Sequence, residues 1–260
     1  MVIEQIQVHP SFGSGNSVLR RDVRIYLPPD YHEHAEKRFP VLYMQDGQNL
    51  FDPRASFAGV AWQADETAQR LILKKKIPSL IIVGIDNTGE HRIDEYTPIR
   101  SHGRGGNAEA YANMLIEELK PFIDDQYRTL PQREFTGIGG SSLGGLLALY
   151  LGLKRHEVFS RIAAMSPSLW WANRFILHEI SDLQTRLPIR IWVDIGRAEG
   201  RHFKSQTRHL QEILIHKGWK KNRNTKLADF RYLEAPKARH DEFSWGARFA
   251  RVLSFLYPMI

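Results

Sequence analysis

Short apolar segments of strand length alternate along most of this chain with segments whose apolar residues recur at helical spacing. Most of the short apolar segments are rich in isoleucine and valine, which favour buried strands. They lie at residues 23–27, 40–44, 80–85, 135–139, 162–165, 189–195 and 230–233. The helical segments lie at residues 62–74, 108–124, 143–154, 175–183, 202–216 and 243–256.

This alternation predicts an α/β fold. Apolar strands that alternate with amphipathic helices are typical of a mostly parallel sheet with helices on both faces. Residues 1–10 also alternate like a strand, which gives a predicted sheet of about eight strands. No helix joins the strands at 23–27 and 40–44, so we expect them to form an antiparallel hairpin at the sheet edge. The chain has 260 residues and no repeat or linker, which predicts a single domain over residues 1–260.

The segment Gly140-Ser141-Ser142-Leu143-Gly144 lies where the predicted strand at 135–139 turns into a predicted helix. A G-x-S-x-G motif in this position is the nucleophile elbow of an α/β-hydrolase. The serine of such a turn has a strained backbone, and a Cβ at either flank would collide with the neighbouring strand or helix. The motif therefore predicts the α/β-hydrolase fold, with Ser142 as nucleophile. The alternative is a glycine-rich turn without a catalytic role.

A serine hydroxyl needs a histidine base and, usually, a carboxylate that orients the histidine. His240 follows the last predicted strand and precedes the last helix, which makes it the predicted base. The acid is expected after the strand at 189–195, where Glu199 lies in the following loop and Asp194 lies within the strand. We favour Glu199 because α/β sites form beyond the carboxyl ends of strands. Asp194 and a dyad without a carboxylate remain alternatives.

The oxyanion of a tetrahedral intermediate needs two backbone N–H donors. One belongs to the residue after the nucleophile, Leu143, and the other to the loop after the strand at 40–44, where we expect Gln48. Gly47 in the same loop is expected to let the chain turn close to the substrate.

Several large side chains are candidates for substrate contact. Trp62, Trp170 and Trp171 offer broad apolar walls suited to an acyl or aryl group, with core packing as the alternative. Arg92 lies in the long polar loop at 86–106, which we expect to be functional. Its guanidinium either binds a substrate carboxylate or phenolate, or pairs with Glu95 or Asp94.

Composition excludes several other functions. The chain has no cysteine, which excludes disulfides and thiolate metal sites. His202, His209 and His216 share one predicted helix without interleaved carboxylates, so we expect no metal site, and the predicted chemistry needs no cofactor.

The formal net charge of +7 raises the question of anionic partners. The densest basic stretches, at residues 74–76 and 217–226, lack interleaved aromatics, which argues against nucleic-acid binding. Residues 1–10 lack the pattern of a secretion signal, and no segment approaches the roughly 20 apolar residues of a membrane span. We therefore expect a cytoplasmic protein without membrane association, and the sequence makes no prediction of its oligomeric state.

Several segments together resemble the "Putative esterase" family of the α/β-hydrolase superfamily. This family includes enterochelin esterases, feruloyl and acetylxylan esterases, S-formylglutathione hydrolases and mycolyltransferases. The resemblance runs from about residue 20 to the C-terminus. It is carried by residues 41–51, 83–87, Arg92 with 95–98, 139–145, 166–171 and His240.

The resemblance implies Ser142 as nucleophile, Glu199 where relatives have Asp or Glu, His240 as base, and the N–H groups of Gln48 and Leu143 as oxyanion donors. It also implies hydrolysis of carboxylic esters, so the expected partner is a small-molecule ester. The function we expect is that of a serine carboxylesterase. The alternatives are an acyltransferase with the same acyl-enzyme and a non-catalytic binding protein on a hydrolase scaffold.

Overall fold

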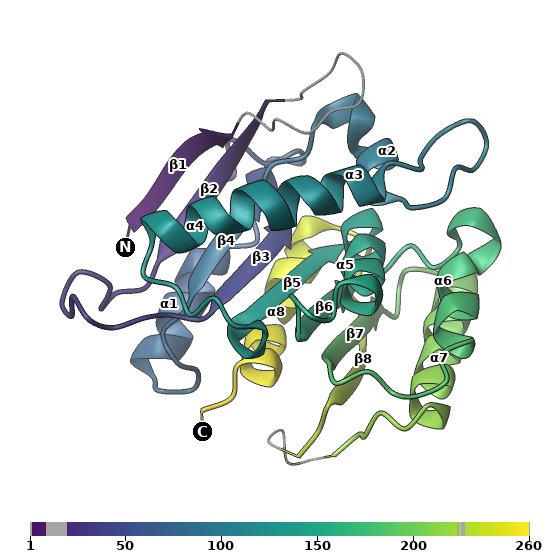
Figure 1. Cartoon of the computed structure of the whole chain (residues 1–260). Helices are drawn as coiled ribbons and strands as arrows, with labels where there is room; N and C mark the ends of the chain where they lie inside the picture. The colour runs from purple at the N-terminus through teal and green to yellow at the C-terminus, as the bar shows by residue number, and fades with distance from the viewer. Residues whose placement is uncertain (1, 9–19, 223, 225–226, 260) are drawn as a thin grey trace.

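The computed structural model describes residues 2–8, 20–222, 224 and 227–259 (Figure 1). Within these residues one eight-stranded sheet has the strand order β1-β2-β4-β3-β5-β6-β7-β8. Met1, His9 and Pro10 of the predicted first strand, and residues 223, 225 and 226 of the basic stretch, lie outside the described residues. The strands are β1 Val2–Val8, β2 Arg21–Leu27, β3 Val41–Gln45, β4 Ile81–Ile85, β5 Thr136–Ser141, β6 Arg161–Met165, β7 Arg190–Gly196 and β8 Phe230–Ala235.

The pairing of the strands confirms a mostly parallel sheet. From β4 through β3 to β8 every neighbouring pair is parallel, whereas β1 and β2 run antiparallel to their neighbours. The predicted hairpin of residues 23–27 with 40–44 is wrong, because β2 pairs with β1 and β4, and β3 lies between β4 and β5. Every residue of β3 and β4 is buried, whereas β2 has half-buried residues at Asp22 and Arg24. Strand β5 is fully buried as well, and these three strands lie next to one another in the interior of the sheet, where neighbours cover them.

The helices are α1 Ala64–Leu73, α2 Arg92–Tyr96, α3 Ala108–Asn113, α4 Lys120–Gln126, α5 Leu143–Lys154, α6 Trp171–Ser181, α7 Arg201–His216 and α8 Glu242–Leu256. A π-helical turn at Met114–Leu119 joins α3 to α4, so the helix predicted at 108–124 is one continuous rod with a wider middle. In α6, residues 172–174 have left-handed backbone angles, and right-handed geometry begins at Phe175, where the sequence predicts it. None of the helices in the described part of the chain combines the length and the apolar character needed to cross a membrane.

Alternate strand residues point to opposite faces of the sheet and build two cores. Val41 and Tyr43 belong to the core that is completed by α3, α5, α6 and α7. Leu42 and Met44 belong to the core on the other face, beneath α1 and α8. Figure 1 shows α3, α4 and α5 in front of the sheet and α8 behind it.

Helix α5 is enclosed more completely than a typical surface helix. All of its residues from Leu143 to Leu153 are buried. A helix that is apolar all round has to lie inside the protein, because no face of it can be left to water. Its N-terminus, directly after Ser142, is therefore fixed relative to the sheet.

Candidate active site

The predicted site residues come together at one edge of the sheet. Strands β3, β5, β6, β7 and β8 are parallel, so their carboxyl ends meet at the same edge. The loop after β3 carries Gln48, the turn after β5 carries Ser142, the turn after β7 carries Glu199 and the loop after β8 carries His240. This is the edge at which ligands bind in open α/β sheets.

Ser142 occupies a strained turn between β5 and α5. Its backbone has φ 56° and ψ −120°, which few residues other than glycine adopt. The Ser142 N–H donates to the carbonyl of Met165 at 3.0 Å, which ties the turn to the end of β6. A Cβ on Gly140 would lie 2.8 Å from the carbonyl carbon of Gly144, so the turn closes only with glycine at this position. The expected strain and the expected need for small residues are both present.

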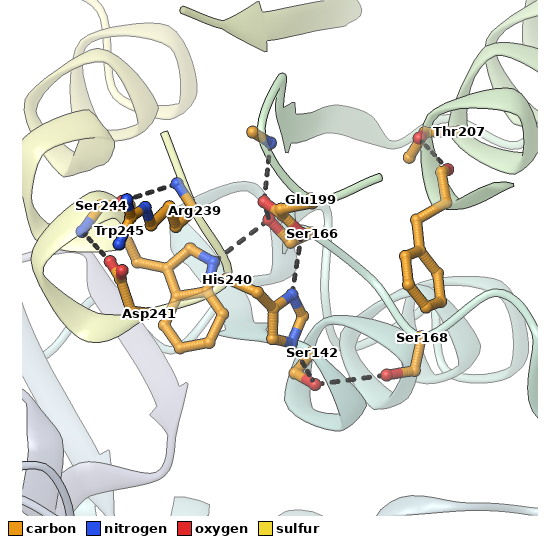
Figure 2. Close-up of polar contacts among 12 residues, drawn as sticks. Ser142, Ser166, Ser168, Glu199, Thr207, Arg239, His240, Asp241, Ser244 and Trp245 are labelled. Atoms are coloured by element: carbon orange, nitrogen blue, oxygen red, sulfur yellow. Dashed lines mark hydrogen bonds and ion pairs between the residues drawn. The ribbon is translucent and has the colours of Figure 1, made fainter. Parts of the chain in front are cut away.

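Figure 2 shows Ser142, His240 and Glu199 in one hydrogen-bonded line. The His240 Nε2 atom lies 2.9 Å from the Ser142 Oγ atom. The His240 Nδ1 atom lies 2.8 Å from Glu199 Oε2. The structure thus brings together a hydroxyl, an imidazole and a carboxylate, in the order that nucleophile activation requires.

Two docked loops hold His240 in this position. The N–H of Ala198, in the turn after β7, donates to the carbonyl of Ala238, in the loop after β8, at 3.0 Å. Asp241 caps α8 by accepting the Ser244 N–H at 2.8 Å, and the Ser244 hydroxyl accepts the Arg239 N–H at 2.9 Å. These bonds fix the chain on both sides of His240, whose side chain keeps 46% of its surface exposed.

Glu199 is buried and is held by several donors. Its side chain is 2% exposed. Glu199 Oε1 accepts the Ser166 hydroxyl at 2.6 Å and the Gly196 N–H at 2.7 Å. Burial alone would favour the neutral acid, but the hydrogen bonds from His240, Ser166 and Gly196 outweigh it and lower the pKa of Glu199 below its ordinary value. The carboxylate is therefore ionised under ordinary conditions.

Asp194 lies in a buried ion pair next to this line. It is fully buried, and its Oδ1 atom accepts a bond from Arg248 Nη2 at 2.9 Å. Its Oδ2 atom accepts the Trp192 indole N–H at 2.8 Å. With both oxygens engaged in this way, Asp194 balances the charge of Arg248, and the carboxylate next to His240 is that of Glu199.

The loop after β3 packs against the elbow. Gln48 lies in a 3₁₀ turn at Gly47–Asn49, and Leu143 is the first residue of α5. The first N–H groups of a helix have no partner within it, so such groups are available to a ligand. Gly47 was expected to approach the substrate, but a Cβ there would lie 2.4 Å from the carbonyl carbon of Gly84. Its role in the structure is close packing of the loop on β4.

Arg92 forms an ion pair with Asp46 rather than with Glu95 or Asp94. Its Nε and Nη2 atoms lie 2.7 and 2.8 Å from the two Asp46 oxygens. Glu95 instead pairs with Arg21 at 2.7 Å, and Asp94 accepts the Gly105 N–H at 2.6 Å. Burial disfavours the charge on Arg92, but Asp46 outweighs it and raises the pKa of the guanidinium. Because Asp46 directly precedes Gly47, this fork-shaped pair anchors the loop that carries Gln48.

The three predicted tryptophans occupy different environments. Trp170 is 46% exposed, two residues after Ser168, whose hydroxyl lies 3.3 Å from Ser142 Oγ. Trp171 is buried and donates its indole N–H to the carbonyl of Ile99 at 2.8 Å. Trp62 is 3% exposed and packs against Trp245 and Phe249, so its indole lies in the core, as the core-packing alternative expects.

Sequence reasoning missed the residues that surround Glu199. Ser166 lies in a segment that carries the family resemblance, but no spacing pattern in the sequence indicates that its side chain contacts Glu199. Trp245 and Arg248 are three positions apart and therefore share a face of α8, directly after His240. That spacing was a usable signal, although only the packing of α8 on the sheet shows what this face contacts.

Comparison with known proteins finds similarity over most of this chain. A family model described as "Putative esterase" matches residues 18–256. The "Uncharacterized protein YbbA" of Bacillus subtilis is 28% identical over 246 residues, which is 91% of this chain and 92% of that protein. The "Ferri-bacillibactin esterase BesA" of Bacillus subtilis is 27% identical over 197 residues, which is 67% of this chain and 65% of that esterase.

A solved structure shows the same fold. The crystal structure of BES protein from Bacillus cereus has a TM-score of 0.76 and 22% sequence identity, and the match covers 99% of this chain and 95% of that chain. At this identity the likeness concerns the fold, which is that of the α/β-hydrolases. Since the family model spans almost the whole chain, this protein belongs to the "Putative esterase" family.

Proposed function

We propose that this protein is a serine carboxylesterase that hydrolyses small-molecule esters through an acyl-enzyme on Ser142. Membership of an esterase family supports ester hydrolysis in general. The observation that carries the finer assignment is the 2.9 Å contact between Ser142 Oγ and His240 Nε2, continued by the 2.8 Å contact from His240 Nδ1 to Glu199.

In the first half of the proposed reaction, His240 Nε2 takes the Ser142 proton as Oγ attacks the ester carbonyl carbon. The negative charge that develops on the carbonyl oxygen is held by the N–H groups of Leu143 and Gln48. Glu199 stabilises the imidazolium that forms. His240 then gives its proton to the alcohol oxygen, the carbon–oxygen bond breaks, and the acyl group remains on Ser142.

In the second half, water attacks the acyl-enzyme with His240 again as base, and the carboxylic acid leaves. The His240 side chain is 46% exposed, so the site is open to water. An acyltransferase would use an alcohol at the same step. The steps need no metal or organic cofactor.

Trp170 supports a substrate class. Its indole is exposed two residues after Ser168, whose hydroxyl lies 3.3 Å from Ser142 Oγ, and an exposed indole suits an acyl or aryl group. The relative BesA is named a ferri-bacillibactin esterase, and we propose siderophore esters among the substrates of this chain for that reason. Arg92 is held by Asp46 and acts on the oxyanion loop in this proposal.

Replacement of the nucleophile tests the mechanism. We expect Ser142→Ala to lower kcat by at least about a thousandfold while the melting temperature stays unchanged, because the hydroxyl is required only in the reaction. A fluorophosphonate should label the parent protein and fail to label the variant. Ser254→Ala is the control, since its hydroxyl bonds to Ala250 within α8. Near-normal turnover by Ser142→Ala would exclude this mechanism.

We expect replacement of Glu199 and of Asp194 to have different effects on turnover and on stability. Glu199→Ala should lower the kcat of the folded protein by roughly 10³- to 10⁴-fold. Asp194→Asn removes the nearest counter-charge of the buried Arg248, and should lower the free energy of unfolding by about 3–5 kcal/mol while the folded fraction keeps its turnover. Kinetics and urea unfolding separate the two effects. If folded Asp194→Asn protein were inactive and Glu199→Ala active, Asp194 would be the acid.

The pH dependence of stability follows from Glu199. Its pKa in the folded protein lies below the ordinary value of 4.5, so the ionised carboxylate stabilises the folded state above that pH. This contribution is lost as the pH falls from 4.5 through the folded-state value. The difference in unfolding free energy between the parent and Glu199→Gln should therefore be larger at about pH 6 than at about pH 3. An equal difference at both pH values would contradict the assigned environment.

The two indoles also predict different effects. Trp170→Ala should lower kcat/KM for aryl esters roughly tenfold by removing an aromatic contact. Trp62→Phe should leave kcat/KM unchanged, because Trp62 lies in the core. Kinetics with aryl and short alkyl esters measure both effects, and a large kinetic effect of Trp62→Phe with normal stability would show that Trp62 acts in the site.

A further inference from the structure

The turn Ser166-Pro167-Ser168, directly after β6, contacts both ends of the catalytic line (Figure 2). The Ser166 hydroxyl lies 2.6 Å from Glu199 Oε1. The Ser168 hydroxyl lies 3.3 Å from Ser142 Oγ, and the Ser168 N–H donates to the Ser142 carbonyl at 3.0 Å. Ser166 is 1% exposed and has φ 41°, so a buried turn of unusual conformation presents this hydroxyl to the acid.

The partners of Ser166 determine where its proton points. Its oxygen accepts the Trp245 indole N–H at 3.1 Å and an Arg248 guanidinium N–H at 3.0 Å. Both groups are donors that cannot accept a hydrogen bond. A serine hydroxyl has one hydrogen and two lone pairs, and these donors engage the lone pairs. The single hydrogen is therefore directed to Glu199.

In this arrangement the two carboxylate oxygens of Glu199 contact different partners. Oε1 receives the Ser166 hydroxyl and the Gly196 N–H, which leaves Oε2 for His240. Arg248 lies 4.0 Å from Oε1 but 2.9 Å from Asp194 Oδ1, so its charge is mainly balanced by Asp194. Ser166 connects the cation to Glu199 by short hydrogen bonds, whereas the direct ion pair of Arg248 with Glu199 is long and involves Oε1, not the Oε2 that faces His240.

We propose that Ser166 is a positioning residue of the esterase reaction, whose hydroxyl is locked as a donor by Trp245 and Arg248 and holds Glu199 with Oε2 turned to His240. The inference rests on the proposed function, because it requires the line of Ser142, His240 and Glu199 to be catalytic. It assigns a role to the part of the family segment at 166–171 that the triad itself does not use.

Ser166→Ala tests the proposal. We expect kcat to fall about 10- to 100-fold, which corresponds to the loss of a hydrogen bond to a charged group. KM should stay the same, because Ser166 is buried behind Glu199 and does not meet the substrate. The pH profile of the unfolding free energy should move to higher pH on its acid side, because burial without this donor raises the pKa of Glu199. A purely structural serine would leave that profile in place.

A double-mutant cycle shows whether Ser166 acts through Glu199. In a Glu199→Ala background, Ser166→Ala should change kcat by less than about threefold, because its partner is already gone. Ser160→Ala is the matched control, since its hydroxyl donates to the Arg133 carbonyl at 2.6 Å just before the other end of β6. This control should keep the parent kcat and pH profile.

The proposal is overturned if Ser166→Ala behaves like Ser160→Ala, or if its full loss persists in the Glu199→Ala background. If Ser166→Ala does not fold, Ser166→Cys decides, because a thiol keeps the volume but donates weakly. A lowered kcat with unchanged KM then supports the proposal, and parental kinetics overturn it. If Ser142→Ala is inactive while the Ser166 variants are normal, only this inference fails. Turnover by Ser142→Ala would contradict the proposed function itself.

Discussion

The backbone of Ser142, held at φ 56° and ψ −120° between β5 and α5, is the constraint on which the site depends. This conformation is unfavourable in isolation, and the surrounding structure has to impose it. The imposition comes from the Ser142 N–H bond to Met165 in β6, from the close contact of Gly140 with Gly144, and from the complete burial of α5. The contacts of β6 and of the buried helix α5 stabilise the strained backbone that presents the Ser142 hydroxyl at the sheet edge.

The parallel sheet brings the other residues of the site close to that hydroxyl. His240 is 98 residues from Ser142 in sequence, yet their side chains meet at 2.9 Å because β5 and β8 end at the same edge. The oxyanion loop reaches the same place from β3, where the ion pair of Asp46 with Arg92 fixes it. Each loop is short or internally bonded, so little conformational entropy remains to be lost when substrate binds.

Charge is distributed so that one carboxylate is available to the imidazole. The buried cation Arg248 lies near both Asp194 and Glu199, and its short contact is with Asp194. Glu199 receives neutral donors instead, which keep it ionised without neutralising it. A carboxylate in this state stabilises an imidazolium more effectively than one that is already paired with an arginine.

Local patterns in the sequence determined the strands and helices, the elbow at Ser142 and the choice of Glu199 and His240 as its partners, because periodicity and turn chemistry depend on neighbouring residues. The position of β3 between β4 and β5, the pairing of Arg92 with Asp46 and the burial of Trp62 were decided by tertiary structure alone. So was the cluster of Ser166, Trp245 and Arg248 around Glu199. These contacts join residues that are 33 or more positions apart, except within α8. The spacing of residues along a chain does not encode which strand lies beside which or which helix face covers them.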